Sequence, residues 1–389
     1  MANNNKHTGP NVPALRFPEF SGEWKTFQLS DLAAYSKERV KMEILSSDNY
    51  VSTENMQQDF AGIKDAISLP SSGTAVEFQV GDILISNIRP YLKKIWLSDR
   101  NGGCSTDVLA LRTKNEKVDS SFLYCCLAND DFVSYVMSGA KGVKMPRGDK
   151  QHILSYNLGV PSIQEQRRIA ELVSLLEKRI SAQTKIIEEL TTLRSALIEK
   201  CAKQSGNFFP LSDILKEVEE RSTIANQHLV LSSTVKGIFS QKEYFNKDIA
   251  SEDNKGYKVV RKGHIVLSPQ NLWMGNINYN NRFDIGIVSP SYKVFSIKEG
   301  FNPIFIAALL QTKKALNEYM LASEQGASIV RRNLNIEAFM AIKFRIPDAR
   351  QQDSLSMAIT AINAKLNNER CYLEQLTMQK SCLLENMFI

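Results

Sequence analysis

The amino-acid sequence contains an internal repeat, and this repeat constrains the fold more than any other feature of the chain. Leu29–Leu32 (LSDL) recurs 182 positions later as Leu211–Ile214 (LSDI). Asp82–Ser86 (DILIS) recurs at the same offset as His264–Ser268 (HIVLS). Self-similarity at a fixed period indicates copies of one structural unit. We therefore expect two similar units in tandem.

The last part of each repeat is predicted to be a long helix. Segments 160–200 and 346–386 align over 41 positions without a gap, and Pro161 and Pro347 stand where the start of a helix tolerates proline. Apolar side chains follow the alternating spacing of four and three that forms a coiled-coil seam. The seam residues are Ile169, Val173, Leu176, Ile180, Ile187 and Leu190 in the first segment, and Leu355, Ile359, Ile362, Leu366, Leu373 and Leu376 in the second.

The two helices are expected to pair as an antiparallel coiled coil. A helix of about 40 residues is about 60 Å long. The segment before each helix has about 140 residues, and a globular block of that length has a radius of roughly 14–15 Å. Gln183 and Glu369 occupy the central seam positions, and in an antiparallel pair they meet and fix the register. Two alternatives stay open: each helix packs only on its own block, or the two polar side chains point to solvent.

The segments before the helices mix strand-like and helical runs. Asp82–Ser86 and Val108–Leu111 are β-rich, and the stretch 120–137 has helical periodicity. The second half repeats this order with His264–Ser268, Tyr292–Phe295 and 303–321. We predict tandem α/β (α+β) blocks separated by two long helices. The predicted boundaries are a flexible N-terminal arm at 1–19, a block at 20–158, a helix at 160–206, a block at 207–345 and a helix at 346–389.

Composition excludes several classes of protein. Hydrophobic residues make up 43% and charged residues 23% of the chain, which is ordinary for a globular protein. No run of residues is apolar enough to span a membrane, and no secretory signal is visible, so we expect a cytoplasmic protein with reduced thiols. The six cysteines and four histidines are scattered, which argues against a zinc site.

The net charge of +6 permits nucleic-acid binding without requiring it. Segment 20–158 has 16 basic and 17 acidic residues, a net charge of −1. Segment 207–345 has 18 basic and 13 acidic residues, a net charge of +5. Any basic surface on the first block must therefore be concentrated on one face.

Enzyme signatures are missing. The sequence contains no phosphate-binding loop, no dinucleotide-binding glycine motif and no H-E-x-x-H zinc motif. Ser289–Tyr292 (SPSY) lacks the Asn or Asp and the second proline of an amino-methyltransferase motif, and is predicted to be the entrance of a strand. The acidic residues are dispersed, whereas a hard metal ion needs clustered oxygen ligands. These absences favour a binding protein.

The helical segments resemble a known family. PSIQEQRRIA (Pro161–Ala170) and LTTLRSAL (Leu190–Leu197) resemble the conserved helical regions of the specificity subunits of type I restriction-modification enzymes. GDILIS (Gly81–Ser86) is similar to a recurrent strand of the family's target recognition domains, and PALRFP (Pro13–Pro18) resembles the opening of many bacterial members. The resemblance covers nearly the whole chain. The second helix departs from the pattern at Pro347–Gln352 (PDARQQ), where the usual Glu is absent.

This resemblance implies a bacterial host-defence protein with no catalytic activity of its own. Each block is then a target recognition domain that reads one half of a bipartite, asymmetric DNA site, and the two helices set the spacer. Two methyltransferase subunits dock on the helices and use S-adenosylmethionine to methylate adenine N6. Two further subunits add ATP- and Mg-dependent translocation and cleavage of DNA. The cofactors would then be bound by these partners, with none in this chain, and no membrane would be involved.

Two matching loops are candidates for DNA contact, since a reader of sequence needs base-edge as well as phosphate contacts. The first carries Lys141, Lys144 and Arg147. Gly142 and Arg147 match Gly326 and Arg331 at an offset of 184, and Arg332 follows in the second loop. Arg and Lys are suited to guanine and phosphate. The alternative is a solvated basic loop.

A second group of candidates lies beside the repeated strand. Arg89, Lys93 and Lys94 match a region that contains Gln270 and Asn271. Asn and Gln are the side chains that pair with adenine through two hydrogen bonds. The alternative is that these polar residues only form turns.

Two other functions are compatible with the sequence alone. One is an enzyme of the same systems, a methyltransferase or nuclease whose motifs have degenerated. The other is a coiled-coil scaffold that carries two protein-binding modules. Salt-sensitive binding of DNA distinguishes the specificity subunit from the scaffold, because phosphate contacts release counterions.

Overall fold

The computed structural model describes residues 11–204, 206–245, 254–325 and 332–389. The chain divides into two compact units, the first formed by residues 1–183 and 372–389 and the second by residues 184–371. Each unit therefore contains one α/β block and part of both long helices. The sequence instead placed the boundaries at the helix ends, because periodicity shows where a helix runs but not what it packs against.

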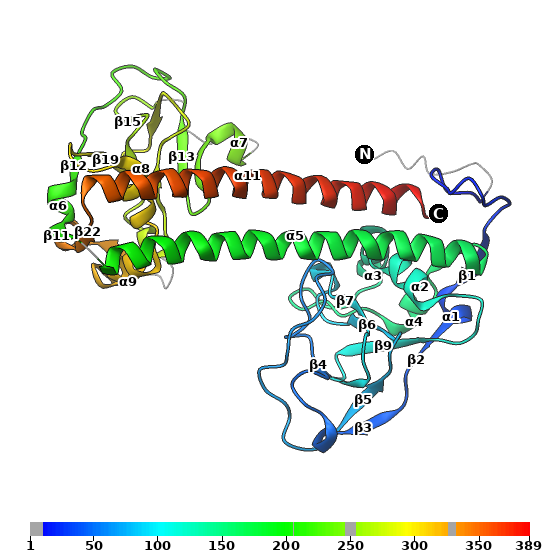
Figure 1. Ribbon diagram of the computed structural model, residues 1–389. Coiled ribbons are helices and arrows are strands. Elements are labelled where there is room, and N and C mark those ends of the chain that lie inside the picture. The colour runs from blue at the N-terminus through cyan, green and yellow to red at the C-terminus, as the bar shows by residue number, and fades with distance from the viewer. Residues whose placement is uncertain (1–10, 205, 246–253, 326–331) are drawn as a thin grey trace. The chain divides into compact units, whose positions relative to one another are not determined.

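Both blocks contain a four-stranded antiparallel sheet of the same order (Figure 1). The order is β2-β9-β6-β7 in unit 1 and β12-β19-β16-β17 in unit 2. In each block, a further two-stranded pair (β1-β10 or β11-β22) joins the first and last strands of the block. This shared topology is what the sequence repeat predicts. The expected mixture of helices and sheets is confirmed.

The block of unit 1 contains the following strands and helices in chain order: β1 (Lys25–Gln28), α1 (Leu29–Leu32), β2 (Ala33–Tyr35), β3 (Arg39–Lys41), η1 (Met42–Ile44), β4 (Tyr50–Val51), β5 (Thr74–Phe78), β6 (Ile83–Ser86), η2 (Pro90–Leu92), β7 (Ile95–Leu97), β8 (Gly102–Cys104), β9 (Val108–Thr113), α2 (Ser120–Leu127), α3 (Asp130–Ser138), α4 (Lys150–Leu154) and β10 (Asn157–Val160). Here η denotes a short 3₁₀ helix.

The block of unit 2 repeats this plan with additional hairpins: β11 (Asn207–Pro210), α6 (Leu211–Ile214), β12 (Leu215–Glu217), β13 (Leu231–Thr234), β14 (Gly237–Ser240), α7 (Gln241–Phe245), β15 (Lys258–Arg261), β16 (Ile265–Leu267), η3 (Leu272–Met274), β17 (Ile277–Tyr279), β18 (Ile285–Val288), β19 (Lys293–Ile297), α8 (Pro303–Leu309), α9 (Lys313–Leu321), β20 (Ser323–Gln325), β21 (Arg332–Leu334), α10 (Ile336–Ala341) and β22 (Lys343–Ile346).

Each predicted helical stretch inside the blocks is two short helices instead of one. The side chain of Asn129 accepts a hydrogen bond from the backbone N–H of Phe132 and starts α3 after α2 has ended. Thr312 caps α9 in the same way, through the N–H of Ala315. Asn and Thr are favoured as caps because their side chains satisfy backbone donors at a helix start.

The two long helices are α5 (Ile163–Gln204) and α11 (Ala349–Asn386). Their seam positions are buried or half-buried in both helices, as the four-three spacing predicts. In unit 1, Glu177 of α5 forms an ion pair with Lys380 near the end of α11, at 2.6 Å. In unit 2, Arg194 of α5 donates a hydrogen bond to Asn363 in the first half of α11. The start of α5 therefore lies along the end of α11 within unit 1, and the end of α5 along the first half of α11 within unit 2.

A buried glutamine attaches each long helix to its block. Gln166 of α5 accepts a hydrogen bond from the backbone N–H of Asp119, the N-cap of α2, and donates to the carbonyl of Lys117. Gln352 of α11 accepts a hydrogen bond in the same way from the N–H of Asn302, the N-cap of α8. Both side chains are at most 3% exposed. The repeated Gln therefore has a structural cause.

The N-terminal segment is anchored where it is described. Arg16 donates two hydrogen bonds to Glu165 of α5, at 2.7 and 2.8 Å, and Glu165 is 1% exposed. The Trp24 indole also donates to Glu165. The expected flexible arm at 1–19 is therefore wrong for residues 11–19, and residues 1–10 lie outside the described residues. The Glu that the second helix lacks corresponds to Glu165, which binds this N-terminal segment in the first helix. The second block has no such segment before it, because it begins directly after α5.

We expect Gln166→Ala to destabilise the fold, because it leaves the part-buried N–H of Asp119 and the carbonyls of Lys117 and Pro161 without their glutamine partner. Each unpaired buried group costs about 1–3 kcal/mol. Urea unfolding of the full chain should show the lower stability. Gln164→Ala is the matched control, since Gln164 is exposed in the same helical turn. Equal stability of the two variants would contradict this role for Gln166.

Candidate nucleic-acid interface

Two segments meet at one end of the central sheet of unit 1. The first follows β6 and contains Asn87 and Arg89, and the second is the loop between α3 and α4. The N–H of Arg89 donates to the carbonyl of Pro146 at 2.8 Å, and the N–H of Gly148 donates to the carbonyl of Asn87 at 3.0 Å. The two groups of candidates on the first block therefore share one site through backbone hydrogen bonds.

The loop itself is a closed hairpin-like turn. Lys141 and Arg147 exchange two backbone hydrogen bonds, each of 2.9 Å. Gly142 has φ +96°, a conformation that glycine adopts without strain. The Lys141 ammonium also donates to Asp149, which caps α4. This hydrogen bond and those from the backbone N–H groups of α4 lower the pKa of Asp149 to about 2.

The cations around this loop differ in their availability. Arg147 is 57% exposed and pairs with Asp107 at 3.0 Å. Arg89 and Lys144 are exposed, and neither forms an ion pair within the part of the chain that the structure describes. Lys94 instead points inward, where its ammonium donates to the carbonyl of Thr53. Burial lowers the pKa of Lys94, and the nearby Arg89 lowers it further.

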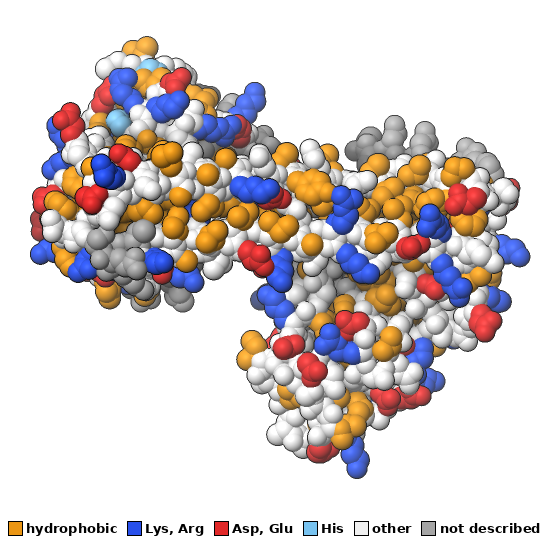
Figure 2. Space-filling model, in the orientation of Figure 1, with side chains coloured by type: hydrophobic (Ala, Val, Ile, Leu, Met, Phe, Trp, Pro, Cys, Tyr) orange, Lys and Arg blue, Asp and Glu red, His pale blue; other side chains and the backbone are white. Residues whose placement is uncertain are grey.

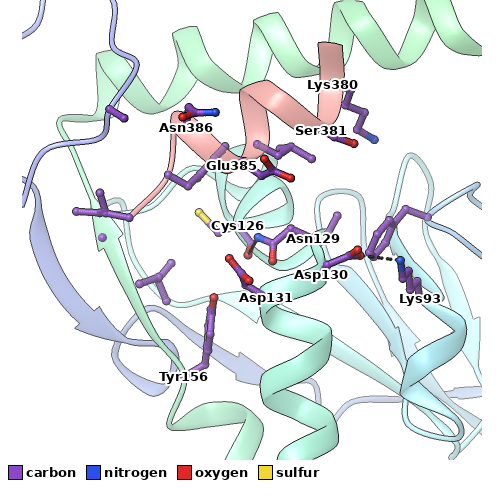
Figure 3. A pocket seen from close by; sticks show the side chains of 18 of the residues that line it. Lys93, Cys126, Asn129, Asp130, Asp131, Tyr156, Lys380, Ser381, Glu385 and Asn386 are labelled. Carbon is purple, nitrogen blue, oxygen red and sulfur yellow. Dashed lines mark hydrogen bonds and ion pairs between the residues drawn. The ribbon is translucent and has the colours of Figure 1, made fainter. Parts of the chain in front are cut away.

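Lys93 faces a cavity instead of the loop. The cavity has a volume of about 770 Å³, and Figure 3 shows Lys93 directed toward Asp130, with which it forms an ion pair at 2.8 Å. Asp131 and Glu385 also line it. With these carboxylates exceeding the cations, the cavity does not suit a phosphate group. Of the predicted cations beside the strand, only Arg89 is therefore available at the loop.

Unit 2 brings the equivalent segments together. The N–H of Arg332 donates to the carbonyl of Gln270 at 3.4 Å. In unit 1, Arg147 forms the corresponding backbone bridge with Ile88. Arg332 also pairs with Gln325 across the β20-β21 hairpin, as Arg147 does with Lys141. The counterpart of Arg147 is therefore Arg332, one position after the Arg331 that the sequence alignment predicted. Arg331 and Gly326 lie outside the described residues.

The side chains of this second site are partly used within the unit. Gln270 is exposed and Asn271 is half-buried at the start of η3. The Arg332 guanidinium donates to the carbonyl of Ser323 at 2.8 Å. Trp273 is not among the residues that the sequence singles out, and its buried indole N–H has no partner among the described residues. An aromatic residue in a short turn next to a candidate loop was the available signal.

The central polar positions of the long helices are not directed to solvent. Gln183 is 5% exposed, and the Glu369 side chain is 13% exposed and forms an ion pair with Lys365 on its own helix. The alternative that both point to solvent is therefore wrong. That the two side chains meet each other stays a prediction.

Surface charge does not form a broad basic face in the view of Figure 2, where Lys and Arg are scattered among Asp and Glu. Apolar side chains stand out on the long helices, and Leu175 and Leu193 on α5 and Met357 and Met378 on α11 are more than half exposed. Among the described residues, no group of histidines, cysteines and carboxylates could hold a metal ion, and no helix has the length and apolar character needed to cross a membrane.

Comparison with known proteins finds similarity to one family. Residues 21–192 match the family described as Type I restriction modification DNA specificity domain. The chain is 28% identical over 100 residues to the EcoDI specificity subunit of Escherichia coli, covering 26% of this chain and 22% of that protein. It is 25% identical over 191 residues to the MjaVIII specificity subunit of Methanocaldococcus jannaschii, covering 48% and 43%. The chain thus spans less than half the length of these curated relatives.

Solved structures show the same fold. The type I restriction-modification S subunit from M. genitalium superimposes with a TM-score of 0.58 at 17% identity, over 97% of this chain and 99% of that one. A chain from a structure describing assembly and conformational transition of a type I R-M system gives a TM-score of 0.51 at 15% identity, over 93% and 96%. The family resemblance predicted from the sequence is confirmed.

Proposed function

We propose that the chain is a member of the type I restriction-modification specificity family and acts as the DNA-recognition subunit of a type I restriction-modification complex. One observation carries the proposal: the two blocks have central sheets of the same strand order, and both join the same two segments by backbone hydrogen bonds. These segments are the turn after β6 and the loop after α3 in unit 1, and the turn after β16 and the hairpin after α9 in unit 2. Such paired loops on a rigid sheet suit base reading, because loops held by a scaffold carry most binding residues.

Each block reads one half of a bipartite DNA site. The two blocks share the order of their central sheet but differ in their loops: Arg89 and Arg147 in the first correspond to Asn271 and Arg332 in the second. Different side chains at equivalent positions specify different bases, so the site is asymmetric. The net charge of +5 for the second block against −1 for the first adds to this difference.

The helices set the distance between the half-sites. We infer that α5 and α11 pair along their length as an antiparallel coiled coil, with Gln183 and Glu369 fixing the register. A polar pair inside an apolar seam selects one register at a cost in stability. This role is supported by the burial of both side chains.

Catalysis belongs to partner subunits. Two methyltransferase subunits dock on the helices, where exposed Leu193 and Met357 offer apolar contacts, and use S-adenosylmethionine to methylate adenine N6. Two restriction subunits supply ATP- and Mg-dependent translocation and cleavage. This chain binds none of these cofactors and is not itself an enzyme.

Sequencing of methylated adenines in DNA treated with the assembled complex tests the proposal. A bipartite motif with a fixed spacer is the expected result. Methylation by the purified chain alone would indicate an enzyme, whereas a complex that binds DNA with no sequence preference and no salt dependence would favour the scaffold function.

We expect Arg147→Ala to weaken DNA binding by the complex. A base contact costs about 1–3 kcal/mol and relaxes only one half of the site, whereas a phosphate contact weakens all sequences alike and reduces the salt slope. Arg100→Ala is the control, because Arg100 is also exposed and ion-paired but follows β7, at the opposite end of the sheet. Unchanged affinity and salt slope for Arg147→Ala would show that this loop is not at the DNA.

We also expect the blocks to be exchangeable. Replacing the first block with that of another reader should change one half-site and leave the other intact, because each block has its own buried core. The exchanged segment must keep Gln166 and Glu165 and include their partners Asp119 and Arg16. Methylome sequencing that shows both half-sites altered would mean that the blocks share one recognition surface.

Lengthening the helices should lengthen the spacer. One heptad inserted after Gln183 and one before Tyr372, at the junction of the two units, keeps the seam and adds about 10 Å at 1.5 Å per residue. At about 3.4 Å per base pair, the spacer should grow by roughly three base pairs. An active variant with the original spacer in its methylated sites would show that the helices do not set the distance.

A further inference from the structure

The tip of the loop between α3 and α4 carries apolar side chains in full contact with solvent. Val143 is 99% exposed and Met145 is 51% exposed. Single exposed apolar residues are common on protein surfaces. These two differ because they lie two positions apart in one closed turn, on a loop whose ends are held by backbone hydrogen bonds.

The loop is fixed by its backbone. Lys141 and Arg147 close it with two hydrogen bonds, and Arg89 binds the carbonyl of Pro146 next to the tip. Pro146 is buried, which seats the base of the loop against the block. Because so few residues separate the two anchored ends, the Val143 side chain is presented outward on a rigid support. A group held in this way loses little conformational entropy on binding.

The surroundings of the tip favour a polyanion as the occupant. Arg89, Lys144 and Arg147 are exposed around it, and Asp107 neutralises only Arg147. An apolar side chain between cations fits a groove of duplex DNA, where phosphates flank the exposed base edges. A protein partner for an exposed apolar tip needs a matching pocket but has no need of Arg89 and Lys144, the two cations beside it that form no ion pair among the described residues.

We propose that Val143 reads the 5-methyl group of a thymine in the major groove of DNA. The inference rests on the proposed function and identifies one base contact within it. Apolar side chains recognise thymine through this methyl group, which only the major groove displays. Valine is short and stiff, so it suits contact with a methyl group, whereas side chains that wedge between base pairs are larger. Arg147 and Lys144 then hold the flanking backbone or a neighbouring guanine.

The test uses the assembled complex of this chain with its methyltransferase subunits. The recognised motif is first selected from a pool of random duplexes. Each thymine in the motif is then replaced by deoxyuridine, which removes only the methyl group. We expect the unaltered complex to bind roughly 3–10-fold more weakly after replacement at one position of one half-site. Val143→Ala should bind the thymine and uracil duplexes equally at that position.

The matched control is Val80→Ala. Val80 is also more than half exposed, but it precedes β6 at the end of the strand opposite the loop. It should keep the full response to uracil. The inference is overturned if Val143→Ala retains that response, if no thymine methyl contributes to binding, or if the half-site assigned to the first block contains no A·T pair. Failure of the unaltered complex to select any motif would overturn the proposed function instead.

Discussion

A buried side-chain amide links recognition block and helix in both halves of this protein. In the first turn of each long helix, Gln166 or Gln352 satisfies the N–H at the start of an internal helix of the block and the carbonyl just before its own helix. The amide is suited to this because it donates and accepts at once. An ionised glutamate at the same place could only accept and would leave carbonyls unpaired. The glutamine contact therefore helps to fix each block to its helix, and in unit 1 the hydrogen bond from Trp24 to Glu165 adds a second link.

The cations around the first candidate site are largely held in ion pairs. Most cations near the first candidate site are already neutralised: Lys93 pairs with Asp130, Lys141 with Asp149 and Arg147 with Asp107. Strong nonspecific attraction to phosphates requires many free cations, and few are available here. An exposed ion pair such as Arg147–Asp107 contributes little to stability, so its arginine can exchange partners at small cost. Under the proposed function, a block of this kind gains affinity mainly from base contacts and less from general attraction to phosphates.

The sequence predicted the features that depend on periodicity, because burial on one face leaves a regular pattern of apolar residues. The repeated strands, the long helices and their seam follow from this pattern. It could not predict the direction of single long side chains: Lys93 and Lys94 are adjacent in sequence, yet one faces an acidic cavity and the other a backbone carbonyl. The sequence pattern could not predict that the N-terminal segment is anchored through Arg16 either, because its partner Glu165 is 149 positions away. Strand pairing in unit 2 makes Arg332 the counterpart of Arg147, whereas the sequence alignment gave Arg331, which lies outside the described residues.

The two hairpins also show how one scaffold can present two different surfaces. The scaffold beneath them is shared, since Ile88 and Gln270 occupy equivalent positions and each contacts the returning strand of its hairpin. In the first block the exposed Arg147 side chain leaves the sheet and pairs outside it, whereas the Arg332 guanidinium turns back to the carbonyl of Ser323. The same backbone position therefore supplies an outward cation in one block and an internal support in the other. Changes confined to the hairpins leave the sheet, the glutamine contact and the helix seam intact, so under the proposed function recognition can change without a loss of folding.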